Sequence, residues 1–370
     1  MIVDALLGIG LQGDVRPAFA AAIGQINASG LPVLAMDIPS GLNGDTGAVQ
    51  GAVVNAELTI TFIGIKRGLL TGRGPAACGE VVLSDLAIPA EVYEGATATA
   101  EQLHLIDLLE LLAPREADAH KGHFGHVMII GGDHGYGGAV IMAAEAAARS
   151  GAGLVSVATR PEHIPSILTR CPEIMACGVA SGQELEQLLS RPSVLVIGPG
   201  LGRSPWSEQM LQAAAKSGLP MVVDADALNI LAEGRVLPDA QARENWLFTP
   251  HPGEAARLLG VTSAEINADR VASIASIQQK FGGAVILKGA GSLVLGETGV
   301  TGIVTAGNPG MATGGMGDVL SGIAGALIAQ GLSVEEAAQL SAVLHASAAD
   351  LAVEKIGQRG LIATDIIPYV

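Results

Sequence analysis

Residues 306–318 form a glycine-rich segment that runs directly into an apolar stretch. Five glycines precede Asp318, and residues 319–329 are almost entirely apolar up to the stop expected at Gly331. Glycine adopts positive φ angles and approaches ligands closely, so such a loop can turn its amides inward as an anion-binding nest. A helix that begins there adds free N–H groups and a positive dipole end. The pattern predicts a phosphate site with Asp318 as proton acceptor; the alternative is a turn that Asp318 merely caps.

Apolar stretches alternate with helical segments along the chain. The expected strands lie within residues 2–10, 33–37, 58–63, 81–86, 127–130, 154–158, 194–197, 221–223, 246–249 and 284–287, followed by a hairpin at 293–295 and 302–305. The expected helices include 17–28, 205–216, 264–281 and 319–329. Nearly continuous apolar strands of this kind indicate parallel sheets with helices on both faces.

Five strands in the second part of the chain end in turns rich in Gly, Pro or Asp. These turns lie at 131–138, 198–202, 224–229, 250–254 and 288–292. The carboxyl ends of parallel strands meet at one edge of a sheet, where ligands of such sheets bind. The recurrence therefore predicts a binding site at this edge.

The charged residues in these turns each have two interpretations. Lys288 either faces a phosphate or is an ordinary surface lysine. His251 lies between two prolines, but single histidines are more often structural or exposed. Glu254 either binds Mg²⁺ through water or caps a helix. Asp224 and Asp226 either share a metal or cap the next helix, and capping is the simpler explanation for one of them.

The charge balance excludes several classes of partner. A net charge of −16 argues against nucleic acid and anionic membranes. Although the mean hydropathy is +0.46, no run reaches the roughly 18 unbroken apolar residues of a spanning helix. The first residues show no pattern of a signal peptide, so we expect a cytoplasmic protein. Three scattered cysteines predict free thiols.

Several motifs occur together in the second part of the chain. They lie at residues 121–122, 129–132, 198–202, 249–254 and 308–318. This set resembles the ADP-dependent NAD(P)H-hydrate dehydratases, which have the ribokinase-like fold. The first part resembles the carboxyl-terminal portion of an NAD(P)H-hydrate epimerase, on residues 4–8 and 37–41.

The resemblance implies an α/β protein with two domains. Residues 118–370 are expected to form a ribokinase-like three-layer α/β/α domain, the dehydratase. A partial Rossmann-like α/β domain, similar to the epimerase, is expected at 1–95. Residues 96–117 are expected to be a linker, because the composition changes there to a run of small residues, a short helical stretch near 107–112 and then Pro114.

The resemblance also assigns residues to ligands. The hydrated nicotinamide nucleotide is assigned to Ala139, Gly200, His251 and Asp318. The adenine nucleotide is assigned to Lys288, Gly289, Ala290, Gly291, Ser292 and Gly317. It further implies homo-oligomerisation, Mg²⁺, and two small-molecule partners, ADP and hydrated NADH or NADPH.

In the epimerase-like part, the resemblance assigns K⁺ to Asp4 and Ser40. It assigns substrate contacts to Asp37, Gly8 and Gly10. The family carries an Asn- and Gly-rich loop upstream of the position of Asp4, and no such loop occurs in these 370 residues. We therefore expect no epimerase activity from this chain alone.

The resemblance implies ADP-dependent dehydration of NAD(P)H hydrate, with Asp318 accepting the hydroxyl proton as the oxygen attacks the β-phosphorus of ADP. A vitamin-precursor kinase of the same fold is the main alternative. Such kinases typically carry Thr-Pro-Asn before the glutamate, where this chain has His251. A non-catalytic nucleotide-binding module is the other alternative, but it would need no proton acceptor at Asp318.

Overall fold

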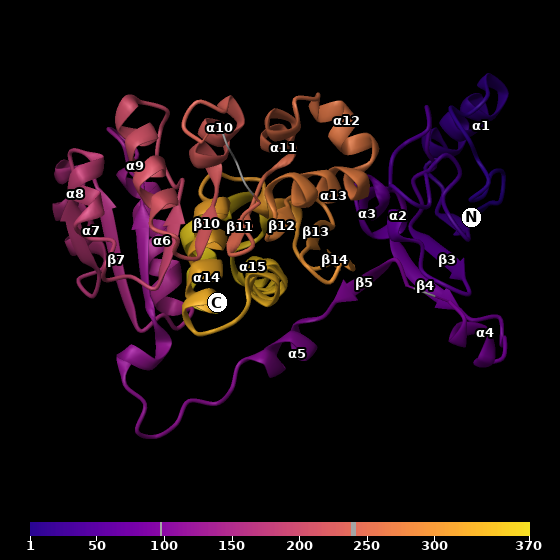
Figure 1. Ribbon diagram of the computed structural model, residues 1–370. Coiled ribbons are helices and arrows are strands. Elements are labelled where there is room, and N and C mark those ends of the chain that lie inside the picture. Colours follow the sequence, from indigo (N-terminus) through magenta and orange to yellow (C-terminus); the bar gives the residue numbers. More distant parts are fainter. Residues whose placement is uncertain (97, 238–241) are drawn as a thin grey trace.

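The computed structural model describes residues 1–96, 98–237 and 242–370 and contains two sheets (Figure 1). We call the elements around the four-stranded sheet, β1 to α4, the N-terminal unit. The elements around the ten-stranded sheet, from β5 onward, are the C-terminal unit. The expected α/β class is confirmed for both.

The N-terminal unit is built on a parallel sheet with strand order β1-β2-β3-β4. Its strands are β1 (Ile2–Asp4), β2 (Val33–Met36), β3 (Leu58–Phe62) and β4 (Glu80–Ser84), and its helices are α1 (Pro17–Ala28), α2 (Arg67–Leu70), α3 (Gly74–Ala77) and α4 (Glu91–Glu94). Helix α1 begins with proline at its first position, where the missing N–H costs nothing.

The C-terminal unit contains the larger sheet, with strand order β5-β14-β13-β12-β11-β10-β9-β6-β7-β8. Its strands are β5 (Ala100–Leu103), β6 (His126–Ile130), β7 (Leu154–Thr159), β8 (Met175–Gly178), β9 (Val194–Ile197), β10 (Met221–Val223), β11 (Trp246–Phe248), β12 (Ala284–Leu287), β13 (Ser292–Leu295) and β14 (Thr301–Val304). All neighbours are parallel except β13, which runs antiparallel to β12 and β14. The expected hairpin is thus confirmed.

Helices cover both faces of this sheet. One face carries α6 (Gly137–Arg149), α7 (Ile164–Arg170), α14 (Met316–Ala329), α15 (Val334–Ile356) and α16 (Ala363–Ile366). The other carries α8 (Gly182–Glu186), α9 (Pro205–Lys216), α10 (Ala225–Glu233), α11 (Pro252–Leu259), α12 (Ser263–Ala268) and α13 (Arg270–Phe281). In β6, Val127 and Ile129 enter the first core while Met128 and Ile130 enter the second. Period-two alternation with both sides apolar produces the three layers.

Gly322 lets helices α14 and α6 approach each other closely. A Cβ at Gly322 would lie 2.1 Å from the carbonyl oxygen of Ala143 on α6. A Cβ at Gly325 would lie 2.5 Å from Cγ2 of Val196 on β9. The two glycines therefore let α14 pack directly on a helix backbone and on the sheet.

The interval 96–117, expected to be a linker, is not wholly irregular. It contains β5, which pairs in parallel with β14, and the short helix α5 (Leu105–Leu108). Leu103 is buried at the end of β5, which explains the pairing. The chain crosses between the two sheets here (Figure 1). The domain boundaries at 95 and 118 stay a prediction.

Within the described residues, no helix is both long and apolar enough to cross a membrane.

Candidate active site

Three charged side chains meet where β10, β11 and β12 end. Lys288 follows β12, and its Nζ donates to Oδ1 of Asp224, the residue after β10, at 2.8 Å. The same Nζ lies 3.9 Å from Oε2 of Glu254, in the first turn of α11. A Cβ at Gly317 would lie 3.2 Å from both Lys288 Nζ and Asp224 Oδ2. The charged cluster therefore lies against the first turn of α14.

Asp318 lies in this first turn of α14 and titrates in an unusual range. Burial, together with the charge of Asp224, raises its pKa to about 7 against the opposing effect of the Lys288 ammonium. Burial also raises the pKa of Glu254 to about 7. Three carboxyl groups thus share one ammonium. The arrangement leaves an acceptor that binds and releases a proton near neutral pH.

The glycine-rich loop before α14 is held by side chains at its start. The carboxylate of Asp350 on α15 accepts from the backbone N–H of Gly307 and from Nδ2 of Asn308, both at 2.8 Å. Asn308 Oδ1 in turn accepts from the N–H of Gly310 at 3.0 Å. Asp350, which sequence reasoning missed, therefore anchors the loop from a distant helix.

Helix α14 begins without a side-chain cap. Its N-cap residue, Gly315, has φ +91°, and Asp318 makes no capping hydrogen bond. The interpretation of Asp318 as a simple cap is therefore wrong. The first N–H groups of the helix lack a side-chain partner, a geometry that attracts an anion.

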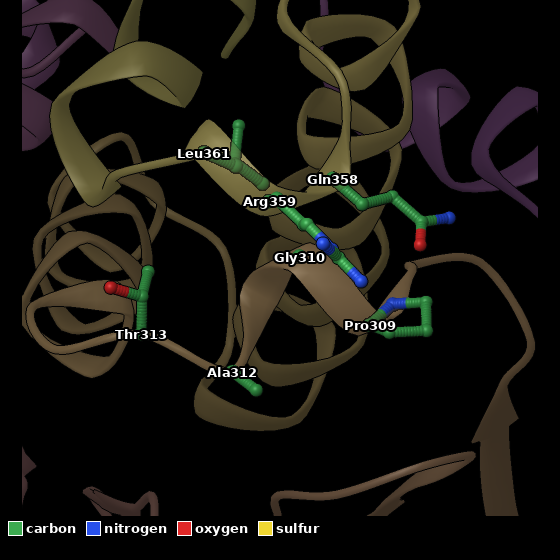
Figure 2. A pocket seen from close by; sticks show the side chains of 7 residues that line it. All are labelled: Pro309, Gly310, Ala312, Thr313, Gln358, Arg359 and Leu361. Carbon is green, nitrogen blue, oxygen red and sulfur yellow. The ribbon is translucent and has the colours of Figure 1, made fainter.

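A cavity of about 340 Å³ lies beside the glycine-rich loop (Figure 2). It is lined by Pro309, Gly310, Ala312, Thr313, Gln358, Arg359 and Leu361. The glycine-rich loop thus forms one part of its wall, and Arg359 is the cationic side chain among the lining residues.

His251 occupies the N-cap of α11. Its ring Nδ1 accepts from the backbone N–H of Gly253 at 2.9 Å. The backbone N–H of His251 donates to Oε2 of Glu254 at 2.8 Å. Burial, with help from the Lys288 charge, lowers its pKa. His251 thus braces the turn as a neutral imidazole, and half of its side chain is exposed beside the charged cluster. Glu254 caps the helix, as one of its two interpretations required.

Neither Asp224 nor Asp226, the two aspartates after β10, caps helix α10 as expected for one of them. Asp224 stands at the N-cap of α10 but makes no capping bond, because its carboxylate pairs with Lys288. Asp226 accepts from the N–H of Gly202 at 3.0 Å. Capping is therefore wrong for Asp224, whose role is electrostatic.

A second polar cluster lies at the ends of β6 and β7. Arg160 Nε donates to Asp133 Oδ1 at 2.7 Å, and Ser204 Oγ donates to Asp133 Oδ2 at 2.8 Å. Gly200 and Ala139 lie together nearby, since a Cβ at Gly200 would be 3.0 Å from that of Ala139. Asp133 and Arg160 were not predicted from the sequence. The signal available was that Asp133 stands in a glycine-rich turn directly after a strand.

The loop after Lys288 is compact. Ser292 Oγ accepts from the N–H of Gly289 at 3.2 Å and contacts the carbonyl oxygen of the same residue at 3.0 Å. Gly291 has φ +59° and Gly289 has φ +145°, so both adopt backbone conformations that favour glycine. Gly289 and Ala290 are exposed, which leaves this part of the loop open to a ligand.

The residues expected in the epimerase-like part lie on the other sheet. Ser40 Oγ donates to Asp4 Oδ1 at 2.7 Å, and the Ser40 N–H donates to Asp4 Oδ2 at 2.8 Å. Asp37 has φ +68° and forms an ion pair with Lys66. Although burial opposes it, the hydrogen bond from Lys66 lowers the pKa of Asp37. The structure thus brings Asp4 and Ser40 together, while Asp37 pairs with Lys66.

Gly8 and Gly10 lie in the exposed turn that follows β1, where an added Cβ would meet nothing within 4 Å. They belong to a different sheet from the Asp318 cluster. Among the residues described, no group of three or more His, Cys, Asp or Glu side chains has the arrangement of a metal site.

Comparison with known proteins gives two family matches. The NAD(P)H-hydrate dehydratase family matches residues 127–370, and the family described as YjeF-related protein N-terminus matches residues 1–68. The chain is 50% identical over 370 residues to the bifunctional NAD(P)H-hydrate repair enzyme Nnr of Coxiella burnetii, covering all of this chain and 75% of that protein. It is 46% identical over 366 residues to the enzyme of the same name from Escherichia coli, covering 99% of this chain and 70% of that one.

Solved structures agree on the fold. A ribokinase-like superfamily protein from Enterococcus faecalis matches with a TM-score of 0.67 and 30% identity, over 74% of this chain and 94% of that one. An ADP/ATP-dependent NAD(P)H-hydrate dehydratase from Bacillus subtilis, co-crystallised with ATP and Mg²⁺, matches with a TM-score of 0.64 and 24% identity, over 74% and 98% of the two chains. The expected ribokinase-like fold is therefore confirmed for the C-terminal unit.

Proposed function

This chain belongs to the NAD(P)H-hydrate dehydratase family of bifunctional NAD(P)H-hydrate repair enzymes, and we propose that Asp318 is the base in its ADP-dependent reaction. The substrate is NADH or NADPH whose reduced pyridine ring has taken up water. One observation carries the proposal: a carboxyl with a pKa of about 7 stands in the first turn of an uncapped helix. Such a group accepts a proton beside a site that attracts phosphate.

The reaction turns a poor leaving group into a good one. The hydroxyl oxygen of the ring attacks the β-phosphorus of ADP while Asp318 accepts the hydroxyl proton, and AMP departs. The ring nitrogen then expels the phosphate ester, and loss of a proton from the neighbouring ring carbon completes NAD(P)H. The amides of the glycine-rich loop and of α14 stabilise the charge on the transferred phosphoryl group.

The remaining assigned residues bind the two ligands in this proposal. Lys288, Gly289, Ala290, Gly291, Ser292 and Gly317 hold the adenine nucleotide, while Ala139, Gly200 and His251 hold the hydrated nicotinamide. The carboxyl groups of Glu254 and Asp224 lie close to the same ammonium, and such oxygens are the ligands that Mg²⁺ prefers, which supports Mg²⁺ bound near them. When bound, Mg²⁺ supplies charge neutralisation to the phosphates.

Two finer points belong to the same proposal. Asp4 and Ser40 offer buried hard oxygen donors of the kind K⁺ takes, which supports a K⁺ site in the N-terminal unit. The family resemblance also implies a homo-oligomer, which sedimentation velocity tests directly.

The decisive experiment incubates the chain with hydrated NADH, ADP and Mg²⁺. We expect the NADH absorbance to return while AMP and phosphate form in equal amounts. A kinase of this fold would instead accumulate a stable phosphorylated substrate, and a nucleotide-binding module would leave the hydrate unchanged. Either of those results contradicts the proposal.

The rate should depend on pH with a midpoint set by Asp318. The proposed reaction needs its carboxylate, and its pKa is raised to about 7. The value of kcat/KM should therefore rise with pH and level off above about 7, falling about tenfold per unit below it. Initial rates across a buffer series at constant ionic strength measure this. A flat profile from pH 5 to about 8 would exclude an essential carboxylate of this pKa.

Replacing His251 with alanine should weaken binding of hydrated NADH more than binding of ADP. The imidazole is neutral and half exposed, so it can hydrogen-bond the carboxamide of the ring. It also braces the turn before α11. Calorimetric titration of each ligand into folded His251→Ala separates the two roles. Equal losses for the two ligands would assign His251 to the turn alone.

A further inference from the structure

The loop that follows Lys288 is held from outside the C-terminal unit. At the end of α2, the N–H of Gly72 donates to the carbonyl oxygen of Ala290 at 3.1 Å. The fully buried hydroxyl of Thr71 donates to the carbonyl oxygen of Gly291 at 2.7 Å. Two consecutive carbonyl groups of this loop thus take their hydrogen bonds from the N-terminal unit.

The same contact explains the glycine at position 291. A Cβ there would lie 1.8 Å from the carbonyl oxygen of Leu70 and 2.6 Å from Cα of Thr71. No side chain fits such a gap, and the φ of +59° also favours glycine. The bare backbone of Gly291 is therefore required by the neighbouring unit, whether or not a nucleotide touches it.

A buried arginine completes the junction. Arg270 begins α13 and is 2% exposed. Its Nε donates to Thr71 Oγ1 at 3.1 Å, and its Nη2 donates to the carbonyl oxygens of Leu287 and Lys288 at 3.0 and 3.3 Å. No carboxylate among the described residues pairs with it. The guanidinium instead fixes the end of β12 and Thr71 in one geometry.

We propose that Thr71 is a positioning residue for the adenine nucleotide, through which the N-terminal unit sets the shape of the loop at residues 288–292. The inference rests on the proposed function only in taking this loop as the nucleotide site. Thr71 can position the loop because its hydroxyl is both a hydrogen-bond donor and a hydrogen-bond acceptor there. It accepts from Arg270 and donates to Gly291, and a buried partner left without its hydrogen bond is costly.

The experiment compares Thr71→Val with wild-type protein. Valine keeps the shape and removes both hydrogen bonds, so the loop relaxes away from its nucleotide-binding form. We expect the Kd and KM for ADP to rise by about tenfold, whereas kcat and the KM for hydrated NADH stay within about twofold. Calorimetric titration of ADP measures Kd without turnover, and initial rates give the kinetic constants.

Thr59 provides a matched control. It is also fully buried in the N-terminal unit and donates to a carbonyl oxygen at 2.7 Å, that of Cys78, within its own unit. Thr59→Val removes one such hydrogen bond where Thr71→Val removes two, so it should lower thermal stability, though by less, and leave ADP affinity unchanged. Thr71→Ser, which keeps the hydroxyl, should retain the wild-type Kd, and Thr71→Ala should share the loss if the valine variant folds poorly.

The outcomes separate the two ideas. An unchanged Kd for ADP in Thr71→Val or Thr71→Ala overturns the positioning role, even if wild type turns over normally. Equal losses of ADP affinity in the Thr59 and Thr71 variants also overturn it, because the effect would then be general destabilisation. ADP binding by wild type without dehydration of the hydrate would instead overturn the proposed function.

Discussion

Asp318→Asn should reduce turnover of hydrated NADH by about 10²- to 10⁴-fold, the usual cost of losing a general base. Asparagine keeps the size and polarity of the side chain but cannot accept the hydroxyl proton. The helix N-terminus and Lys288 remain, so ADP should bind with nearly unchanged affinity. Single-turnover kinetics with saturating ADP, together with calorimetric titration of ADP, check the two halves of this expectation. Retention of more than about half of the activity would remove Asp318 from the mechanism.

The thermal stability of Asp318→Asn shows whether this variant is folded. Burial raises the pKa of Asp318 from its ordinary value near 4 to about 7, so the folded state keeps a proton that the unfolded chain releases between these values. The cost of ionising Asp318 is therefore absent below about pH 4 and complete above about pH 7. Since asparagine never ionises, the variant should unfold a few degrees higher than wild type at pH 8, with the gap closing toward pH 4.

Lys288→Met should have the second large effect, on both stability and ADP binding. The ammonium is the cation shared by Asp224, Glu254 and Asp318. Since the Lys288 side chain is 22% exposed, its removal should cost less than the roughly 3–5 kcal/mol of a fully buried pair. The pKa of Asp318 should rise further because Lys288 now holds it down. At neutral pH we expect turnover to fall by at least about 10²-fold, as a protonated base adds to lost phosphate binding. Denaturant unfolding and the pH dependence of kcat/KM measure these effects.

A double variant distinguishes the two parts of the Lys288 effect. Combining Lys288→Met with Asp224→Asn removes both partners of the 2.8 Å pair, so most of the lost stability should return while ADP binding stays weak. Lys216→Met, at the exposed end of α9, is the matched control and should change neither quantity. Wild-type ADP affinity in Lys288→Met would contradict a role for this ammonium in nucleotide binding.

Much of the fold follows from local pattern. Strands such as β6 and β9 are short apolar runs closed by glycine turns, and these signals can be read without tertiary information. Strand β8 was missed because Met175–Gly178 has few of the β-branched residues typical of strands. Strand β5 was missed because its partner β14 lies about 200 residues away, and pairing with that strand is what makes Ala100–Leu103 a strand.

Some residues of the candidate site could likewise be predicted from local sequence, and others could not. Asp318 and Lys288 stand next to recognisable turns, so their positions could be predicted. The Asp133–Arg160 pair joins residues from the turns after β6 and β7, and Arg270 meets Thr71 across 199 positions. No local pattern carries such contacts. Asp224 shows the limit most clearly, since its sequence context suits a cap while tertiary structure gives its carboxylate to Lys288.

The missing side chain of Gly322 limits how far the first turn of α14, which carries Asp318, can move. Because α14 rests directly on the backbone of α6, it cannot tilt or slide without opening a void or colliding with Ala143. The turn that carries Asp318 is thus fixed in place, so the proton transfer that we propose there would incur little reorganisation energy. In the same proposal the glycine-rich loop, anchored by Asp350 at one end, is the part that adjusts to the ligands. In the proposed mechanism, alignment of Asp318 therefore depends on the absence of a side chain at Gly322, one helical turn further along α14.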